Sequence, residues 1–140
     1  MDKTALYSFM TRARYGVISS LAADGTPQSA LVGVAITPEL EIIFDTLKST
    51  RKYANLSSRS ACSVVLWWGG EQTVQIDGVA AEPPGAELDS YREIYFAAWP
   101  DGRDRLVWAG ITHLVVRPRW IRAIDYDQVP PLIEEMRFPT

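Results

Sequence analysis

The stretch Phe44-Asp45-Thr46-Leu47-Lys48-Ser49-Thr50-Arg51-Lys52 leads from an apolar, strand-like segment into the start of a helix-like segment. Its last seven positions hold three cations and three hydroxyls. A helix N-terminus offers unpaired backbone N–H groups and a partial positive charge, so an anion is already favoured there. Cations at this end oppose the helix dipole unless an anion compensates them. The segment therefore predicts a site for a bound phosphate group.

Taken by itself, the same segment also fits a simpler description. A helix start that is capped by Ser49 or Thr50 and carries ordinary solvated surface charges has the same composition. Such charge clusters are common on protein surfaces. The segment alone leaves both interpretations open, and the rest of the chain has to decide between them.

On either side of this stretch, short apolar or alternating runs are separated by turn signals. Ala23-Asp24-Gly25-Thr26 is typical of a hairpin turn, and Gly69-Gly70 and Pro83-Pro84-Gly85 mark further turns. The pattern predicts strands over 15–22, 27–37, 41–46, 61–68, 72–81, 111–116 and 120–126. It predicts helices over 2–14, 48–58 and 87–99.

Short strands at even spacing favour a single mainly β domain over residues 1–140, an antiparallel barrel with helical decorations. The run 61–68 is nearly all apolar, which predicts a strand buried on both faces. The tail from Asp127 contains three prolines and is expected to wrap the surface or a partner.

Composition narrows the functional classes. The net charge is −3, from 14 basic and 17 acidic residues, which gives no broad electrostatic reason to bind nucleic acid. No apolar run approaches the roughly 18 residues of a membrane span, and no segment resembles a signal peptide. Cys62 is the single cysteine and cannot form an internal disulfide. These features predict a cytoplasmic protein without membrane partners.

Several motifs, in order, resemble the pyridoxamine-phosphate-oxidase-like split β-barrels that bind FMN. The run from Phe44 to Lys52, followed by Asn55-Leu56, is similar to the phosphate-binding signature of that family. Arg14-Tyr15-Gly16-Val17 resembles its first strand, residues 24–28 its first hairpin, and residues 73–78 its later flavin-side strand. The resemblance covers residues 5 to 126.

The resemblance implies an FMN cofactor in a cleft between the two subunits of a homodimer. By position, Arg51 and Lys52 would hold the FMN phosphate, assisted by Thr46 and by the hydroxyl of Ser49 or Thr50. The backbone of residues 31–34, including Val32, would lie along the isoalloxazine ring. Gln72 or Gln75 would hydrogen-bond the ring edge or the ribityl chain.

The chain also departs from the oxidases that this family is named for. Ala35 stands where they have a substrate-binding lysine, and Ile124 stands where they have a tryptophan near FMN. Their final arginine-rich substrate segment has no counterpart here. The resemblance therefore implies cofactor binding, while the substrate and the catalytic residues stay unassigned.

Four functions follow as hypotheses. The first is an FMN-dependent oxidoreductase that acts on a small molecule, because flavin carries its own redox chemistry and needs no acid–base dyad. The second uses a deazaflavin in its place. The third is a non-enzymatic sensor or carrier of flavin or haem, with His113 as the first candidate haem ligand. The fourth is a purely structural dimerisation module.

Side chains outside these motifs have structural interpretations. His113 has no metal-ligating or catalytic companions in the sequence, so no metal site is predicted and a structural role is favoured. Cys62 lies in an apolar strand and is expected to pack as a small hydrophobe. The aromatic stripe Tyr91, Tyr95 and Trp99 is expected to pack in the core or at a dimer contact.

Overall fold

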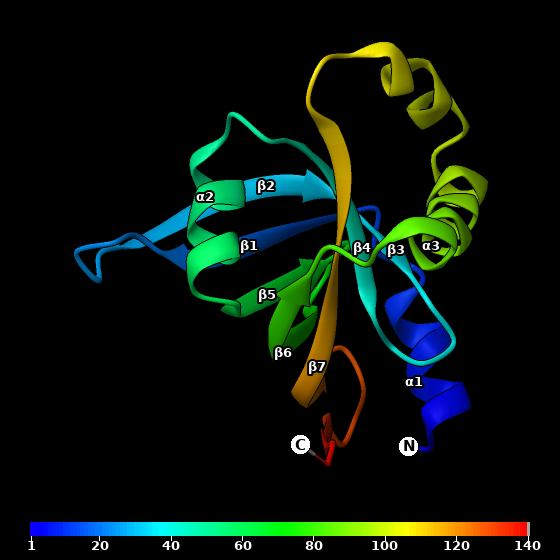
Figure 1. Ribbon diagram of the computed structural model, residues 1–140. Helices are drawn as coiled ribbons and strands as arrows, with labels where there is room; N and C mark the ends of the chain where they lie inside the picture. The colour runs from blue at the N-terminus through cyan, green and yellow to red at the C-terminus, as the bar shows by residue number, and fades with distance from the viewer. Residues whose placement is uncertain (140) are drawn as a thin grey trace.

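The computed structural model describes residues 1–139, which form one curled antiparallel sheet decorated by helices (Figure 1). The strands are β1 Tyr15–Leu21, β2 Pro27–Gly33, β3 Ala35–Ile36, β4 Ile42–Leu47, β5 Ala61–Trp67, β6 Gln72–Ala81, β7 Ile111–Asp125 and β8 Leu132–Arg137. The helices are α1 Lys3–Met10, α2 Arg51–Ser58 and α3 Gly85–Ala98, with a 3₁₀ segment, η1, over Pro100–Val107. The mainly β split-barrel prediction is confirmed.

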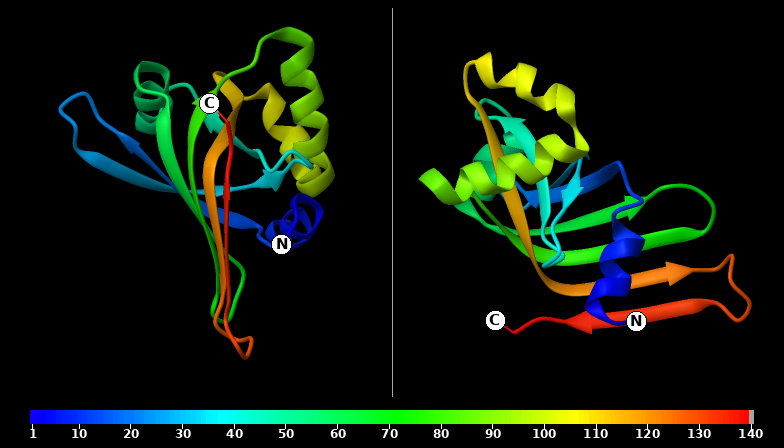
Figure 2. Two further views of the ribbon diagram at one scale, coloured as in Figure 1. Left: turned by 90° about the horizontal axis from the view of Figure 1, so that it is seen from below. Right: turned by 90° about the vertical axis from the view of Figure 1, so that its right-hand side faces the viewer.

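Strand order explains why the barrel is split. The hydrogen-bonded path is β2-β1-β5-β6-β7-β4-β3, and β8 pairs with β7. The long strand β7 pairs with β4 through its first half and with β8 through its second half, while β6 runs alongside both halves. This strand therefore bends the sheet into a half-barrel, and within residues 1–139 the path ends at β2 and β3 without joining them (Figure 2).

The core follows from the alternation of side chains along the strands. Apolar side chains on the concave face pack with α1, whose residues Leu6, Phe9 and Met10 are buried. A second, smaller cluster lies between β4 and α3, where Ile43 and Val115 contact Tyr95 and Phe96. Strand β4 is thus buried on both sides, and the turn that follows it starts from a rigid base.

Strand β5 is not buried on both faces, contrary to the prediction for 61–68. Val64 and Leu66 are buried, whereas Val65 and Trp67 are 40% and 60% exposed. Burial alternates along this strand, but the residue types do not reveal it, because both faces carry apolar side chains.

Other boundaries also differ from the prediction. Residues 111–125 form one strand, because Pro118 pairs with Gly78 at a register shift that accommodates the missing N–H donor. The predicted strand 27–37 is divided into β2 and β3. The helix expected from residue 2 to residue 14 ends at Met10, with Asp2 as its N-cap.

The C-terminal tail contributes a strand that the sequence pattern did not predict. Its residues 132–137 form β8 beside β7, so the tail wraps this chain's own sheet. The N-terminus lies next to it, with the Met1 amino group 3.4 Å from Glu134. Among residues 1–139, no helix has the length and apolar character needed to cross a membrane.

Candidate cofactor site

The turn between β4 and α2 is held by a compact set of hydroxyl hydrogen bonds. Thr50 is the N-cap of α2: its side chain accepts from the Tyr53 N–H and donates to the Leu47 carbonyl at 2.8 Å. The buried Thr46 hydroxyl lies 3.0 Å from the Thr50 hydroxyl. The helix therefore begins at Arg51, three residues later than predicted, and Thr50 rather than Ser49 caps it.

A cavity of about 130 Å³ opens where this helix start meets β1 and β2. Thr50, Arg51 and Lys52 line one side, and the other side is formed by Ser20, Gln28, Ser29 and Ala30. We call it the phosphate cavity, after the group that the sequence predicts for this segment. It lies at the split, because β2 is the last strand of the hydrogen-bonded path.

The electrostatics of this cavity favour an anion. Burial lowers the pKa of Lys52, and attraction by Asp45 acts in the opposite direction. Neither Arg51 nor Lys52 forms an ion pair with a carboxylate of residues 1–139. A partly desolvated ammonium beside an unneutralised guanidinium, at a helix N-terminus, suits a phosphate.

Lys48, the third cation of the turn, faces elsewhere. Its ammonium lies 3.9 Å from the carboxylate of Glu82, which also accepts from the Tyr53 hydroxyl at 2.8 Å and from Thr112. This network ties the turn and α2 to the ends of β6 and β7. Lys48 therefore contributes to holding the helix, and the phosphate cavity keeps two cations.

Of the residues predicted for the cofactor, four come together at this cavity. Thr50, Arg51 and Lys52 line it, and Thr46 lies behind the lining with its hydroxyl against that of Thr50. Ser49 is exposed and outside the lining. The side chain of Val32 is buried in the core, so only its backbone is available along β2.

Gln72 and Gln75 lie on β6, which β1 and β5 separate from β2. The Gln72 side chain accepts a hydrogen bond from the Trp68 indole. Gln75 is exposed on the convex side of the sheet, beside Val65 of β5. The structure of one chain therefore does not bring these glutamines to the phosphate cavity, and their roles stay predictions.

The β-strand side of the phosphate cavity was not predicted. The Asn55 amide on α2 donates to Gln28 at 2.8 Å and to Ser20 at 3.1 Å, which fixes both side chains at the cavity wall. One sequence signal was present: Ser20 follows Val17-Ile18-Ser19 at the inward-facing position that Ile18 shares. A polar residue on an inward face indicates a polar partner or a site.

His113 occupies a different environment. Its ring packs edge to face against the rings of Tyr95 and Phe96, at centroid distances of 4.9 and 5.5 Å, and its Nδ1 accepts from the Arg92 Nε at 3.2 Å. Burial, and then the charge of Arg92, lower the pKa of His113 to about 4. The ring is therefore neutral at pH 7 and locks α3 onto β7, which agrees with a structural role.

Acid should weaken the fold through this histidine. The unfolded chain binds the proton near pH 6.5 and the folded chain only near pH 4. The contribution of His113 to the free energy of unfolding is therefore fully present above pH 6.5 and is lost as the pH falls toward 4. The loss should approach about 3 kcal/mol at pH 4. Urea unfolding across this pH range measures the free energy of unfolding of the unchanged protein and of His113→Phe, which keeps an aromatic ring at this position. The variant should show a shallower pH slope, and equal slopes would contradict this account.

Comparisons with known proteins agree with this geometry. The sequence model of the family described as pyridoxamine 5'-phosphate oxidase matches residues 3–124. The chain belongs to this family. A pyridoxine/pyridoxamine 5'-phosphate oxidase of Nocardioides sp. is 31% identical over 104 residues, which is 74% of this chain and 47% of that protein. The chain thus spans about half the length of this curated relative.

Solved structures of other proteins share the fold of this chain at low sequence identity. A pyridoxamine 5'-phosphate oxidase-related, FMN-binding protein from Nostoc punctiforme superposes with a TM-score of 0.70 at 10% identity, covering 97% of this chain and 96% of that one. A haem-binding protein from Mycobacterium smegmatis gives 0.81 at 16% identity, covering 98% and 59%. The same half-barrel therefore occurs in proteins with different cofactors.

Proposed function

We propose that this chain binds FMN through the phosphate cavity and serves as an oxidoreductase for a small molecule. The observation that carries the proposal is the pair of unneutralised cations, Arg51 and Lys52, at the capped start of α2. The residues fit the group: two cations and Thr50 line one side of a space of about 130 Å³, suited to a phosphate. Bound FMN would supply redox chemistry at its ring.

The edge of β2 provides the next contact. Its outer backbone edge faces the split, next to the phosphate cavity at Ala30. Val34 is already satisfied, because its N–H donates to the Arg14 carbonyl and its own carbonyl accepts from the Trp99 indole. We therefore place the flavin ring along residues 30–33, shifted by one residue toward the N-terminus from the range 31–34 that the resemblance implied.

We further propose a homodimer that forms through the convex face of the sheet, called the outer face: Tyr15, Val17, Leu31, Val65, Trp67 and Gln75. Leu31, Val17, Val65 and Gln75 follow one another across four paired strands. Leu31 is 69% exposed, and the surrounding apolar side chains form a contiguous patch, which is typical of an interface. In such a dimer Gln75 would lie between the subunits, where the predicted flavin contact becomes feasible.

Haem is the less supported cofactor. His113 is buried against two aromatic rings, and its Nδ1 accepts a hydrogen bond from Arg92. Its Nε2 has no hydrogen-bond partner within residues 1–139, but this atom is buried, so a haem iron could reach it only if the packing around the ring opened. The haem-binding neighbour shares the fold at 16% identity, which does not extend its ligand to this chain.

The test is spectroscopic. The purified protein is titrated in parallel with FMN, a deazaflavin and haem, and any co-purified cofactor is identified by mass. We expect FMN to bind most tightly, with a flavin absorption band and anaerobic bleaching by NADH or NADPH. Tighter binding of the deazaflavin would overturn the assignment of FMN as the cofactor. Bound flavin that no donor reduces would indicate a carrier. A protein that neither binds nor is stabilised by any cofactor would be a structural module.

A further inference from the structure

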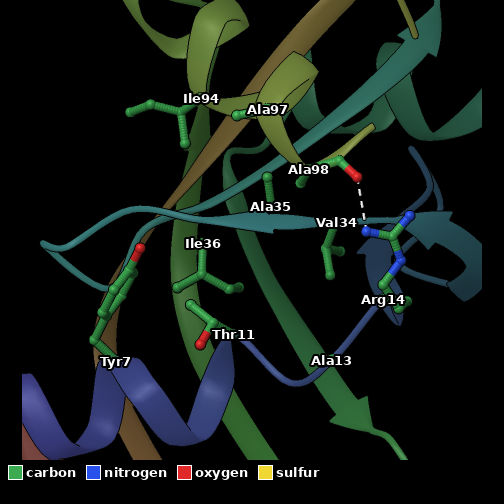
Figure 3. A pocket seen from close by; sticks show the side chains of 10 residues that line it. All are labelled: Tyr7, Thr11, Ala13, Arg14, Val34, Ala35, Ile36, Ile94, Ala97 and Ala98. Atoms are coloured by element: carbon green, nitrogen blue, oxygen red, sulfur yellow. Dashed lines mark hydrogen bonds between the residues drawn. The ribbon is translucent and has the colours of Figure 1, made fainter. Parts of the chain in front are cut away.

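A second cavity, of about 240 Å³, lies between α1, β3 and α3, apart from the phosphate cavity (Figure 3). Strand β3 crosses it, with Ala35 pointing toward Ile94 and Ala97 of α3 and Ile36 pointing toward α1. The Arg14 guanidinium stands at one end, and the ring of Tyr7 rises from α1 at the other. We call it the Arg14 groove. Its small side chains leave a narrow, mainly apolar space with polar ends.

Arg14 is held in a fixed orientation. Its Nη1 donates to the Ala98 carbonyl at 2.7 Å, and its guanidinium carbon lies 3.9 Å from the centroid of the Trp99 ring. Trp99 is itself anchored, because its indole nitrogen donates to the Val34 carbonyl at 2.9 Å. The indole lies so close to Gly33 that a Cβ there would be 2.9 Å from it. A guanidinium that is stacked in this way loses little freedom when it binds an anion.

The charge of Arg14 is not neutralised within residues 1–139. No aspartate or glutamate of this part of the chain forms an ion pair with it. One of its N–H groups serves the end of α3, and the planar fork has four more. The fork geometry matches a carboxylate, which accepts two parallel hydrogen bonds.

We propose that the Arg14 groove binds a small carboxylate with a planar apolar body. The carboxylate would pair with the Arg14 fork, and the apolar body would lie between β3 and the Ala97 face of α3. A monoanion suits this site because a single cation stands at the C-terminal, electronegative end of a helix. The phosphate cavity differs, since it joins two cations to a helix N-terminus. The two sites therefore select different anions, and the groove does not depend on FMN.

Benzoate and its neutral analogue benzamide test the proposal. Amide NMR titration should show benzoate shifting the resonances of Ala35, Ile36 and Ala97, with benzamide binding at least about tenfold more weakly. Arg14→Gln should weaken benzoate by a similar factor and leave benzamide nearly unchanged. The matched control is Arg12→Gln, which removes a nearby charge outside the groove lining. Ala97→Leu, which narrows the groove and keeps the Arg14 charge, should weaken the binding of both probes.

Three outcomes would overturn the proposal. The first is equal binding of benzoate and benzamide. The second is full benzoate affinity in both Arg14→Gln and Ala97→Leu. The third is a set of shifts centred on Arg51 and Lys52, which would place benzoate in the phosphate cavity. Repeating the titration with FMN at saturation separates the two hypotheses, because groove binding should persist whether or not FMN binds.

Discussion

Replacing Arg51 and Lys52 together by alanine should lower FMN affinity by about a hundredfold or more. Each cation can form a charge-assisted hydrogen bond with the phosphate, and such bonds contribute about 1.5–3 kcal/mol each. Lys52 is partly desolvated before any anion arrives, so its interaction is less screened than at an open surface. Quenching of flavin fluorescence during titration measures the change.

The control is the double variant Arg12→Ala with Arg119→Ala. It removes the same net charge from positions outside the phosphate cavity and should keep FMN affinity within a few-fold of the unchanged protein. Circular dichroism should report the same fold for both double variants, because Thr50 still caps α2. If the Arg51 and Lys52 variant bound FMN as tightly as the control, the phosphate would have to lie elsewhere.

The part of this site that could be predicted is the part made by local sequence. Thr46, Thr50, Arg51 and Lys52 lie within one turn and one helix start, so spacing alone places them together. The opposite wall could not be predicted in the same way. Ser20 and Gln28 reach Asn55 across 35 and 27 positions of sequence, and only the pairing of the strands brings them there. A pattern of residue types contains no direct signal for that contact.

The same difference between local signals and long-range pairing explains the errors in the fold prediction. Proline at 118 indicates a strand break locally, yet Gly78 on the partner strand allows the ladder to continue. A Cβ at Gly78 would lie 2.5 Å from the Arg117 carbonyl oxygen, so only glycine fits opposite the irregularity. The compensation lies on another strand, forty positions away along the chain, and propensity at residue 118 cannot reveal it. The pairing of β6 with β7 therefore decides that the strand continues through Pro118.

The error on β5 is informative about assembly. Its sequence is apolar on both faces, which is typical of a strand covered on both sides, but one chain covers only the side of Val64 and Leu66. The uncovered side belongs to the outer face. A second copy seated there would bury Val65 and Trp67, and sequence pattern and structure would then agree. The error in the prediction for one chain thus supports the proposed dimer.

Leu31→Glu combined with Val65→Glu should convert a dimer of this protein into a monomer at micromolar concentration. In a two-fold interface each substitution appears twice, so four carboxylates would enter a desolvated apolar contact. Burying unpaired charges costs several kcal/mol per group, more than a typical dimer contact can offset. The control, Val107→Glu, changes an apolar side chain that is 87% exposed on η1, outside the outer face, and should leave the dimer intact. Sedimentation measures the mass.

Cofactor affinity in that monomeric variant then locates the flavin. Arg51, Lys52 and the β2 edge are unaltered in it, apart from the side chain of Leu31, so the phosphate contacts of one chain persist. If the ring lies between subunits, contacts from the second copy disappear and FMN affinity should fall at least about tenfold, since each lost hydrogen bond contributes about 1 kcal/mol. A monomer that keeps the original affinity would place the whole cofactor within one chain. An unchanged protein that sediments as a monomer would remove the dimer itself.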